Sequence, residues 1–224
     1  MHKNLIIAPH FDDEILGVGG TISKFIGKQD FYICIVTNGN KGNPKIFSKK
    51  HCEQVKNISK KIKKIANIKN YFYLNLPATK LDQIPLSKIS DKLIQLTNKI
   101  KPSKVYIPSS KDMHIDHRII HNASLVAFRP IYKHKIKTIL SYEVLSETEW
   151  GSELGESFKP NYYEQLSQND INFKIKLFQL YKSEVKKFPH PRSKEGIRNL
   201  SSIRGQYINY NFAEAFEIIK HINE

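Results

Sequence analysis

Two short groups of histidine and aspartate in this sequence have the residue types for metal-assisted hydrolysis. The first is His10-Phe11-Asp12-Asp13, and the second is His114-Ile115-Asp116-His117. Two histidines and a carboxylate that leave one coordination position open are the ligand set of catalytic zinc hydrolases. Zinc held in this way acidifies a water molecule, and a further carboxylate beside it can act as a general base.

Each group alone is weak evidence for such a site. A single histidine after a strand is more often a solvated or internally satisfied polar residue, and Asp12-Asp13 could simply cap a helix. The His-x-x-His pattern of 114 and 117 also arises by chance, with capping and exposure as its ordinary explanation. A metal site is favoured because both groups occur in one chain and each follows the end of a predicted strand.

Both groups follow segments that we predict to be buried strands. Leu5-Ile6-Ile7-Ala8 is a continuous apolar run that ends at Pro9, and Val105-Tyr106-Ile107 ends at Pro108. Such runs are typical of parallel strands that are covered on both faces. Ligands of open α/β sheets bind beyond the carboxyl ends of the strands. The two groups are therefore expected to face one crevice.

The rest of the chain alternates in the same way. Further strands are predicted at 31–36, 71–74, 138–142 and 213–219, with helices at 15–26, 48–66, 86–100, 119–127, 171–188 and 193–207. This order predicts the α/β class, with residues 1–224 forming a single Rossmann-like domain whose mainly parallel sheet is flanked by helices. Between 146 and 168 the periodicity fails, so we expect a long loop there that could act as a lid.

The strong positive charge does not by itself indicate that the protein binds nucleic acid. The net charge is +15, but only 5 of the 36 basic residues are arginine. Surfaces that read phosphates or bases use arginine more often, because its planar fork binds bidentately. No motif of the usual DNA-binding or RNA-binding modules is present. We therefore expect no nucleic-acid partner.

The cysteines and the N-terminal segment point to a cytoplasmic protein. Cys34 and Cys52 form neither a CxxC motif nor a disulfide framework, which fits a reducing compartment. The N-terminus lacks the apolar core of a signal peptide, and no stretch approaches the roughly 20 apolar residues of a spanning helix. No transmembrane segment is expected. The oligomeric state stays open, a homo-oligomer included.

Taken together, the two groups resemble a known family. Pro9-His10-Phe11-Asp12-Asp13-Glu14 looks like the PHPDDE signature of the PIG-L / LmbE-like N-deacetylases, and His114-Ile115-Asp116-His117 looks like their HxDH motif. The similarity extends over nearly the whole chain, through Pro108-Ser109 with Asp112, Tyr142-Glu143-Val144 with Thr148-Glu149-Trp150, and Ala213-Glu214-Ala215-Phe216.

The resemblance implies a role for each residue of the two motifs. His10, Asp13 and His117 would bind Zn²⁺, and Asp12 would be the general base. His114 would be the electrophilic or acid partner, oriented by Asp116. Another divalent ion such as Fe²⁺ could replace zinc, because occupancy follows availability as well as geometry.

Five further residues are expected to bind the substrate, namely Lys50, Asp82, Trp150, Arg192 and Arg204. Lys50 stands where relatives often have arginine. Trp150 could stack on a sugar face or, alternatively, be buried and anchor its loop. The C-terminal stretch that contains Arg192 and Arg204 holds three of the five arginines, as an anion-binding rim would.

The expected function is the zinc-dependent removal of an acetyl group from an N-acetylated amino sugar of the N-acetylglucosamine type. The sugar would be a small molecule, free or linked to a nucleotide or lipid carrier, and the basic surface mildly favours a phosphorylated carrier. Two alternatives remain open. One is a zinc amidase on a non-sugar acyl-amine, and the other is a basic nucleic-acid-binding protein with a vestigial metal site.

Overall fold

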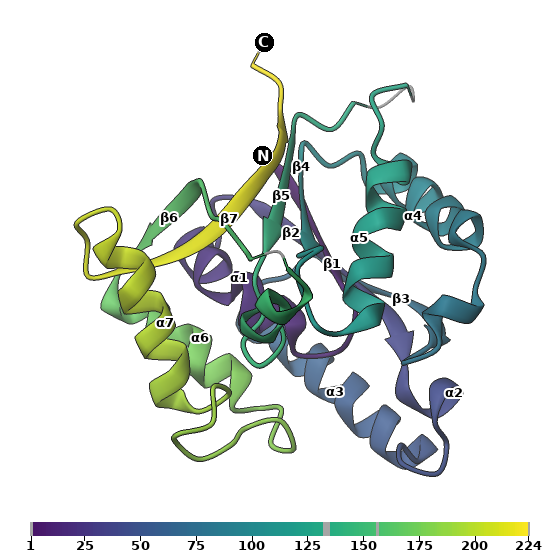
Figure 1. The fold of residues 1–224 in the computed structure, drawn as a ribbon, viewed down its shortest axis with the longest axis horizontal. Helices are drawn as coiled ribbons and strands as arrows, with labels where there is room; N and C mark the ends of the chain where they lie inside the picture. The colour runs from purple at the N-terminus through teal and green to yellow at the C-terminus, as the bar shows by residue number, and fades with distance from the viewer. Residues whose placement is uncertain (1, 132–134, 156, 224) are drawn as a thin grey trace.

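The core of the molecule is a seven-stranded sheet in the order β3-β2-β1-β4-β5-β7-β6 (Figure 1). The computed structural model describes residues 2–131, 135–155 and 157–223. Its strands are β1 (Lys3–Ala8), β2 (Asp30–Asn38), β3 (Asn70–Pro77), β4 (Lys104–Pro108), β5 (Thr138–Tyr142), β6 (Tyr162–Leu166) and β7 (Phe212–His221). Strands β1 to β5 are paired in parallel, and β7 is antiparallel to both of its neighbours. The mainly parallel α/β sheet is confirmed.

Helices cover both faces of this sheet (Figure 1). They are α1 (Asp13–Lys24), α2 (Gly39–Gly42), α3 (Lys49–Ile65), α4 (Leu86–Ile100), α5 (Ile115–Ala127), α6 (Gln168–Phe178) and α7 (Lys194–Gln206), with the 3₁₀ turns η1 (Leu81–Gln83) and η2 (Glu149–Leu154). Alternate residues of β1 enter different cores: Leu5 and Ile7 pack with α4 and α5, whereas Ile6 and Ala8 pack with α1 and α6. This two-sided burial explains the unbroken apolar run of the strand.

The predicted long loop at 146–168 is wrong in part, because it contains η2 and the edge strand β6. Strand β6 pairs with residues 212–216 of β7. The buried residues of β6 are Glu164 and Leu166, so an acidic side chain occupies an inward position. Glu164 is tolerated there because Lys24 Nζ lies 2.6 Å from its carboxylate. Because a charged residue occupies a buried position of β6, the segment lacks the alternation of apolar and polar residues by which a strand is predicted from sequence.

The helix predicted at 171–188 is also too long. Helix α6 ends at Phe178, and an irregular segment continues to the start of α7. Tyr181 in this segment is buried and donates its hydroxyl to Glu14, 2.7 Å away. The segment thereby lies against the β1–α1 turn and contributes side chains to the crevice described below.

The order of the strands creates a crevice between β1 and β4. From β1 the chain builds β2 and β3 on one side, and it then returns to place β4 on the other side. The loops that follow β1 and β4 consequently diverge at the carboxyl edge of the sheet. His10 lies in the first loop, and His114 lies in the second, just before α5. The expectation that both motifs face one crevice is borne out by this topology.

Candidate active site

The turn between β1 and α1 is held in an uncommon conformation. Asp12 has a φ of 93°, a value that side chains other than glycine adopt rarely. Its backbone N–H donates to Glu14 Oε2 at 2.9 Å. The other oxygen of the buried Glu14 accepts hydrogen bonds from Tyr71 and Tyr181, at 3.3 and 2.7 Å. These contacts fix the backbone that presents Asp12 and Asp13.

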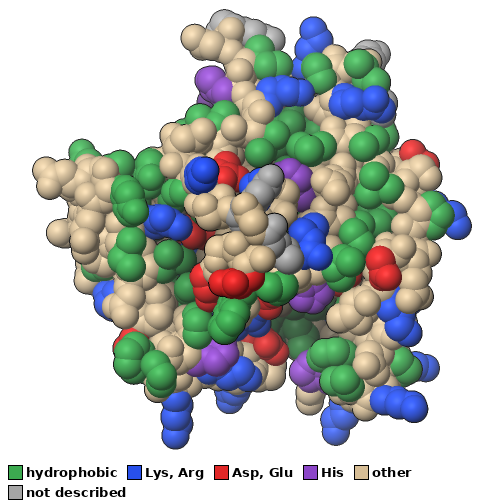
Figure 2. All heavy atoms as spheres, viewed as in Figure 1, with side chains coloured by type: hydrophobic (Ala, Val, Ile, Leu, Met, Phe, Trp, Pro, Cys, Tyr) green, Lys and Arg blue, Asp and Glu red, His purple; other side chains and the backbone are tan. Residues whose placement is uncertain are grey.

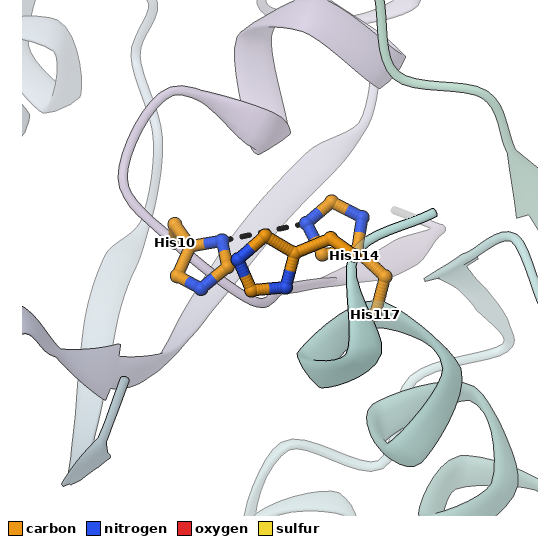
Figure 3. A group of neighbouring side chains, drawn as sticks. All are labelled: His10, His114 and His117. Atoms are coloured by element: carbon orange, nitrogen blue, oxygen red, sulfur yellow. Dashed lines mark hydrogen bonds between the residues drawn. The ribbon is translucent and has the colours of Figure 1, made fainter. Parts of the chain in front are cut away.

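Three atoms of the two motifs form a nearly equilateral triangle. His10 Nδ1 and His117 Nε2 are 3.3 Å apart, and Asp13 Oδ2 lies 3.4 Å from the first and 3.3 Å from the second. Figure 3 shows the rings of His10 and His117 converging from the β1 loop and from α5. A tetrahedral ion with bonds of about 2.0–2.1 Å separates its ligand atoms by about 3.3–3.4 Å. The triangle therefore fits a zinc-sized ion.

A second donor set shares two of these residues. Nitrogen atoms of His10, His114 and His117 all lie within 4.8 Å of one another, so these histidines could also hold a metal. However, His114 Nδ1 accepts the backbone N–H of Asp116 at 3.1 Å. In a neutral ring, Nε2 then carries the hydrogen and acts as a donor. This tautomer suits His114 for hydrogen bonding to a substrate better than for binding a metal.

Each histidine of the triangle has a carboxylate on its other nitrogen. Asp116 Oδ2 lies 3.0 Å from His10 Nε2, and Asp112 Oδ2 lies 2.5 Å from His117 Nδ1. Thr148 donates its hydroxyl to the other oxygen of Asp112. Such outer carboxylates orient metal-binding histidines and raise their basicity. The two pairs are a further reason to regard His10 and His117 as metal ligands.

Asp116, which the resemblance implies as the residue that orients His114, contacts that ring through its backbone N–H and not through its carboxylate. The Asp116 carboxylate turns toward His10 and also accepts the backbone N–H of Thr79 at 2.7 Å. Thr79 follows β3, so a third loop fixes the direction of this side chain. Asp112 was not among the predicted site residues, although its position five residues before His117 belongs to the motif region.

The metal-free triangle holds protons strongly. Burial lowers the pKa of His10, but its hydrogen bonds to Asp116 and Asp13 outweigh burial and raise the pKa to about 9. The pKa of His117 is likewise raised, mainly by the charge of Asp13 acting against burial. Burial raises the pKa of Asp13, yet the two histidines hold it well below its usual value. A divalent cation would replace these protons as the partner of Asp13.

Asp12 is buried beside the triangle without belonging to it. Its side chain accepts a hydrogen bond from Arg192 Nη1 at 3.1 Å. Burial and the neighbouring charge of Asp13 raise the pKa of Asp12 well above its usual value, and Arg192 opposes them. A buried carboxylate with a raised pKa is suited to accept a proton near neutral pH.

His114 is neutral at physiological pH. Burial and the adjacent rings of His10 and His117 lower its pKa to about 4. Of the two roles that the resemblance implies for His114, the acid role needs a protonated ring, whereas the structure favours a neutral ring that donates from Nε2. A neutral imidazole can still stabilise a developing oxyanion through a hydrogen bond.

Part of this site borders a cavity of about 240 Å³. His10, Asp12 and His114 form its floor, and Arg192 contributes from the segment before α7. Much of the remaining wall is apolar or aromatic and consists of Phe11, Phe47, Val55, Ala78 and Tyr181. The cavity thus combines a polar floor with surfaces on which the apolar face of a sugar ring can pack.

Of the five predicted substrate residues, Arg192 is the one that the structure places in the cavity wall. Its guanidinium is engaged by acidic side chains: Nη1 lies 3.3 Å from Glu184, and Nη2 lies 3.4 Å from Glu147. Sequence reasoning missed both of these glutamates, because nothing local connects them to Arg192.

The other four lie elsewhere. Lys50 is exposed on α3, next to His51 of the wall, and Asp82 lies at a separate shallow hollow. Arg204 forms a bidentate pair with Glu143, at 2.8 and 2.6 Å, beside another cavity. Trp150 is 59% exposed on η2, so it is neither a buried anchor nor part of the described cavity wall.

Comparison with known proteins assigns the chain to a family. Residues 5–128, which carry both motifs, match the family described as PIG-L, GlcNAc-PI de-N-acetylase. The chain belongs to the PIG-L family. This confirms the resemblance that the two motifs indicate.

Individual relatives span most of this PIG-L chain. It is 28% identical over 185 residues to the uncharacterized deacetylase YaiS of Escherichia coli K12, covering 80% of this chain and 90% of the relative. The conserved protein TT1542 of Thermus thermophilus has a similar fold, with a TM-score of 0.78, 20% identity and coverage of 100% and 97%. The N,N'-diacetylchitobiose deacetylase of Pyrococcus horikoshii also has a similar fold. Its TM-score is 0.76 and its sequence identity 20%, and the match covers 97% of this chain and 83% of the Pyrococcus protein.

The helices in the described ranges of this PIG-L chain are not of the membrane-spanning kind. None of the helices there combines the length and the apolar character needed to cross a bilayer.

Proposed function

We propose that the chain hydrolyses the amide bond of an N-acetylated amino sugar of the N-acetylglucosamine type, releasing acetate and the free amine. The observation that carries the proposal is the buried Asp12 carboxylate beside the His10, Asp13 and His117 triangle, at the floor of an open cavity. Membership of a family described as a de-N-acetylase supports it, as do the names of YaiS and the Pyrococcus enzyme.

His10, Asp13 and His117 would hold the metal ion, for which we propose zinc. When bound there, zinc would polarise the amide carbonyl and make a water molecule more acidic. Fe²⁺ would fit the same donors, since two imidazoles and a carboxylate accept several divalent ions.

Different residues around the triangle carry out the proton transfers and stabilise the developing charge. Asp12 takes a proton from the attacking water, while Arg192 keeps its carboxylate in place. The Nε2–H of His114 donates to the amide oxygen as negative charge develops on it. The proton held by Asp12 passes to the nitrogen of the leaving amine, so that water and amide yield acetate and amine.

Measuring acetate release tests this proposal. The purified chain is incubated with a panel that contains N-acetylglucosamine, N-acetylgalactosamine, their nucleotide- and lipid-linked forms, and acetylated amines without a sugar. We expect release from at least one acetylated sugar and faster turnover than with any acyl-amine that lacks a sugar. Release confined to the acyl-amines would overturn the substrate class and leave a metal amidase.

A change at Arg192 should alter the pH dependence of this activity. A base must be deprotonated, so the rate falls as the pH drops through the pKa of Asp12. Because Arg192 opposes the rise in that pKa, Arg192→Gln raises it further, and the acidic limb of the pH–rate profile moves to higher pH. We expect the loss of kcat at about pH 6 to exceed that at about pH 8 by up to about tenfold. An equal loss at all pH values would contradict this coupling.

A further inference from the structure

Two lysine-rich segments form opposite rims of the cavity opening. The first, residues 41–51, contributes Phe47 and His51 to the cavity wall, and the second, residues 182–194, contributes Ser183 and Arg192. We call them the mouth rims. In Figure 2, Lys and Arg side chains lie on both sides of a hollow at the lower edge of the molecule.

The outward-facing charges of the mouth rims are positive. Eight exposed lysines belong to them: Lys41, Lys45, Lys49, Lys50, Lys182, Lys186, Lys187 and Lys194. Lys24, Lys69 and Lys174 form ion pairs in the described part of the chain, and no ion pair is seen there for any of these eight. The first rim contains no Asp or Glu, and Glu184 of the second rim turns inward to Arg192, 3.3 Å away. The exposed Glu53 and Glu195 adjoin the two rims, so eight exposed lysines outnumber the acids around them and the rims carry a net positive charge.

Each mouth rim also exposes a large apolar side chain beside a lysine. Ile46 follows Lys45 and is 70% exposed, the highest value for a large hydrophobic residue among those described. Phe188 follows Lys187 and is 62% exposed. Single exposed apolar residues are ordinary, but here two of the most exposed ones lie on opposite rims of one opening. Apolar side chains set among lysines are typical of surfaces that enter the headgroup region of a bilayer.

We propose that the mouth rims dock on an anionic lipid surface, with Ile46 and Phe188 entering the interface and the lysines lying among the headgroups. A nucleic acid or a soluble polyphosphate would use the lysines but would leave both apolar side chains in water. Docking in this orientation would turn the cavity opening toward the lipid. It would follow that the acetylated sugar is linked to a lipid, and this step rests on the proposed function. The binding to the lipid surface does not rest on it.

Co-sedimentation of the full chain with vesicles, without any substrate, tests the docking. Vesicles of phosphatidylcholine alone are compared with vesicles in which roughly one lipid in three is phosphatidylglycerol. We expect binding to the anionic vesicles that weakens with salt, and much weaker binding to the neutral ones. A lysine near such a surface contributes a factor of about five in affinity, so Lys45→Gln with Lys187→Gln should lower it about 25-fold. Ile46→Ser with Phe188→Ser should lower it about tenfold or more.

Matched controls separate the mouth rims from the general lysine content of the chain. Lys88→Gln with Lys92→Gln changes two exposed lysines of α4, and Ile131→Ser removes an apolar side chain that is 69% exposed. We expect both controls to bind like the unchanged chain. Acetate release from a water-soluble acetylated sugar should be unaltered in the rim variants, because none of the four rim residues changed lines the cavity.

Several results would overturn the proposal. If the control variants bound vesicles as weakly as the rim variants do, the binding would be due to the overall charge of the chain and not to the mouth rims. Loss of binding in the lysine variant alone, with displacement by RNA or polyphosphate, would indicate a soluble polyanion as the partner. Slower release from the soluble substrate in the Ile46→Ser and Phe188→Ser variant would make these residues part of the substrate site. Absence of vesicle binding would refute docking while leaving the proposed hydrolysis untouched.

Discussion

Asp12→Asn should retain the metal and lose at least about 100-fold in kcat, the scale expected for a general base. Asparagine has nearly the same shape as aspartate and tolerates a positive φ well, so the turn should survive the change. The amide oxygen can still accept a hydrogen bond from Arg192, but the side chain cannot take a proton from water. KM should change little, since the affected group acts mainly in the transition state.

The measurement combines metal analysis with steady-state kinetics on the same preparation. Glu147→Gln is the matched control, because this carboxylate also lines the cavity and contacts Arg192 but has no assigned role in proton transfer. We expect a much smaller loss from it than from Asp12→Asn. A metal-loaded Asp12→Asn variant with nearly unchanged kcat would rule out Asp12 as the base.

Asp13→Ala and His117→Ala should lose both metal and activity, whereas His114→Ala should lose activity alone. The distances of 3.3 and 3.4 Å around Asp13 Oδ2 motivate this division, together with the backbone hydrogen bond that His114 Nδ1 accepts. Asp112→Asn, which alters the partner of His117, should weaken metal binding by about 10–100-fold. Removal of a ligand itself should weaken it by more.

Metal binding to the unchanged chain should also strengthen as the pH rises. His10 holds a proton up to about pH 9 in the metal-free state, and a cation must displace that proton. Titration with zinc at several pH values, followed by calorimetry, measures both the affinity and the protons released. Loss of zinc from His114→Ala but not from Asp13→Ala would show that the three histidines form the metal site instead.

The position of the site could be predicted from the sequence because it depends on strand order. Two apolar runs, each ending in proline before a histidine group, were enough to place His10 and His114 at one edge of a parallel sheet. The topology, with β4 next to β1, then brings their loops together. Short-range patterns sufficed here because buried parallel strands are recognisable from their own residues.

The contacts that orient the site could not be predicted in this way. Asp116 turns to His10 because the backbone N–H of Thr79, from a distant loop, holds its carboxylate. Arg192 reaches Asp12 across 180 positions of sequence. Strand β6 pairs with β7, and its buried Glu164 contacts Lys24 from a distant helix. Each of these features is set by packing between distant segments, which leaves no periodic signal in the sequence.

The proposed N-deacetylase activity requires one metal ion, held by His10, Asp13 and His117. Its most direct test is acetate release from the best substrate of the panel after chelation, as zinc is added back. We predict no release from the metal-free chain and full recovery at about one ion per chain, as an open catalytic site requires. An undiminished rate in the metal-free chain would contradict the claim.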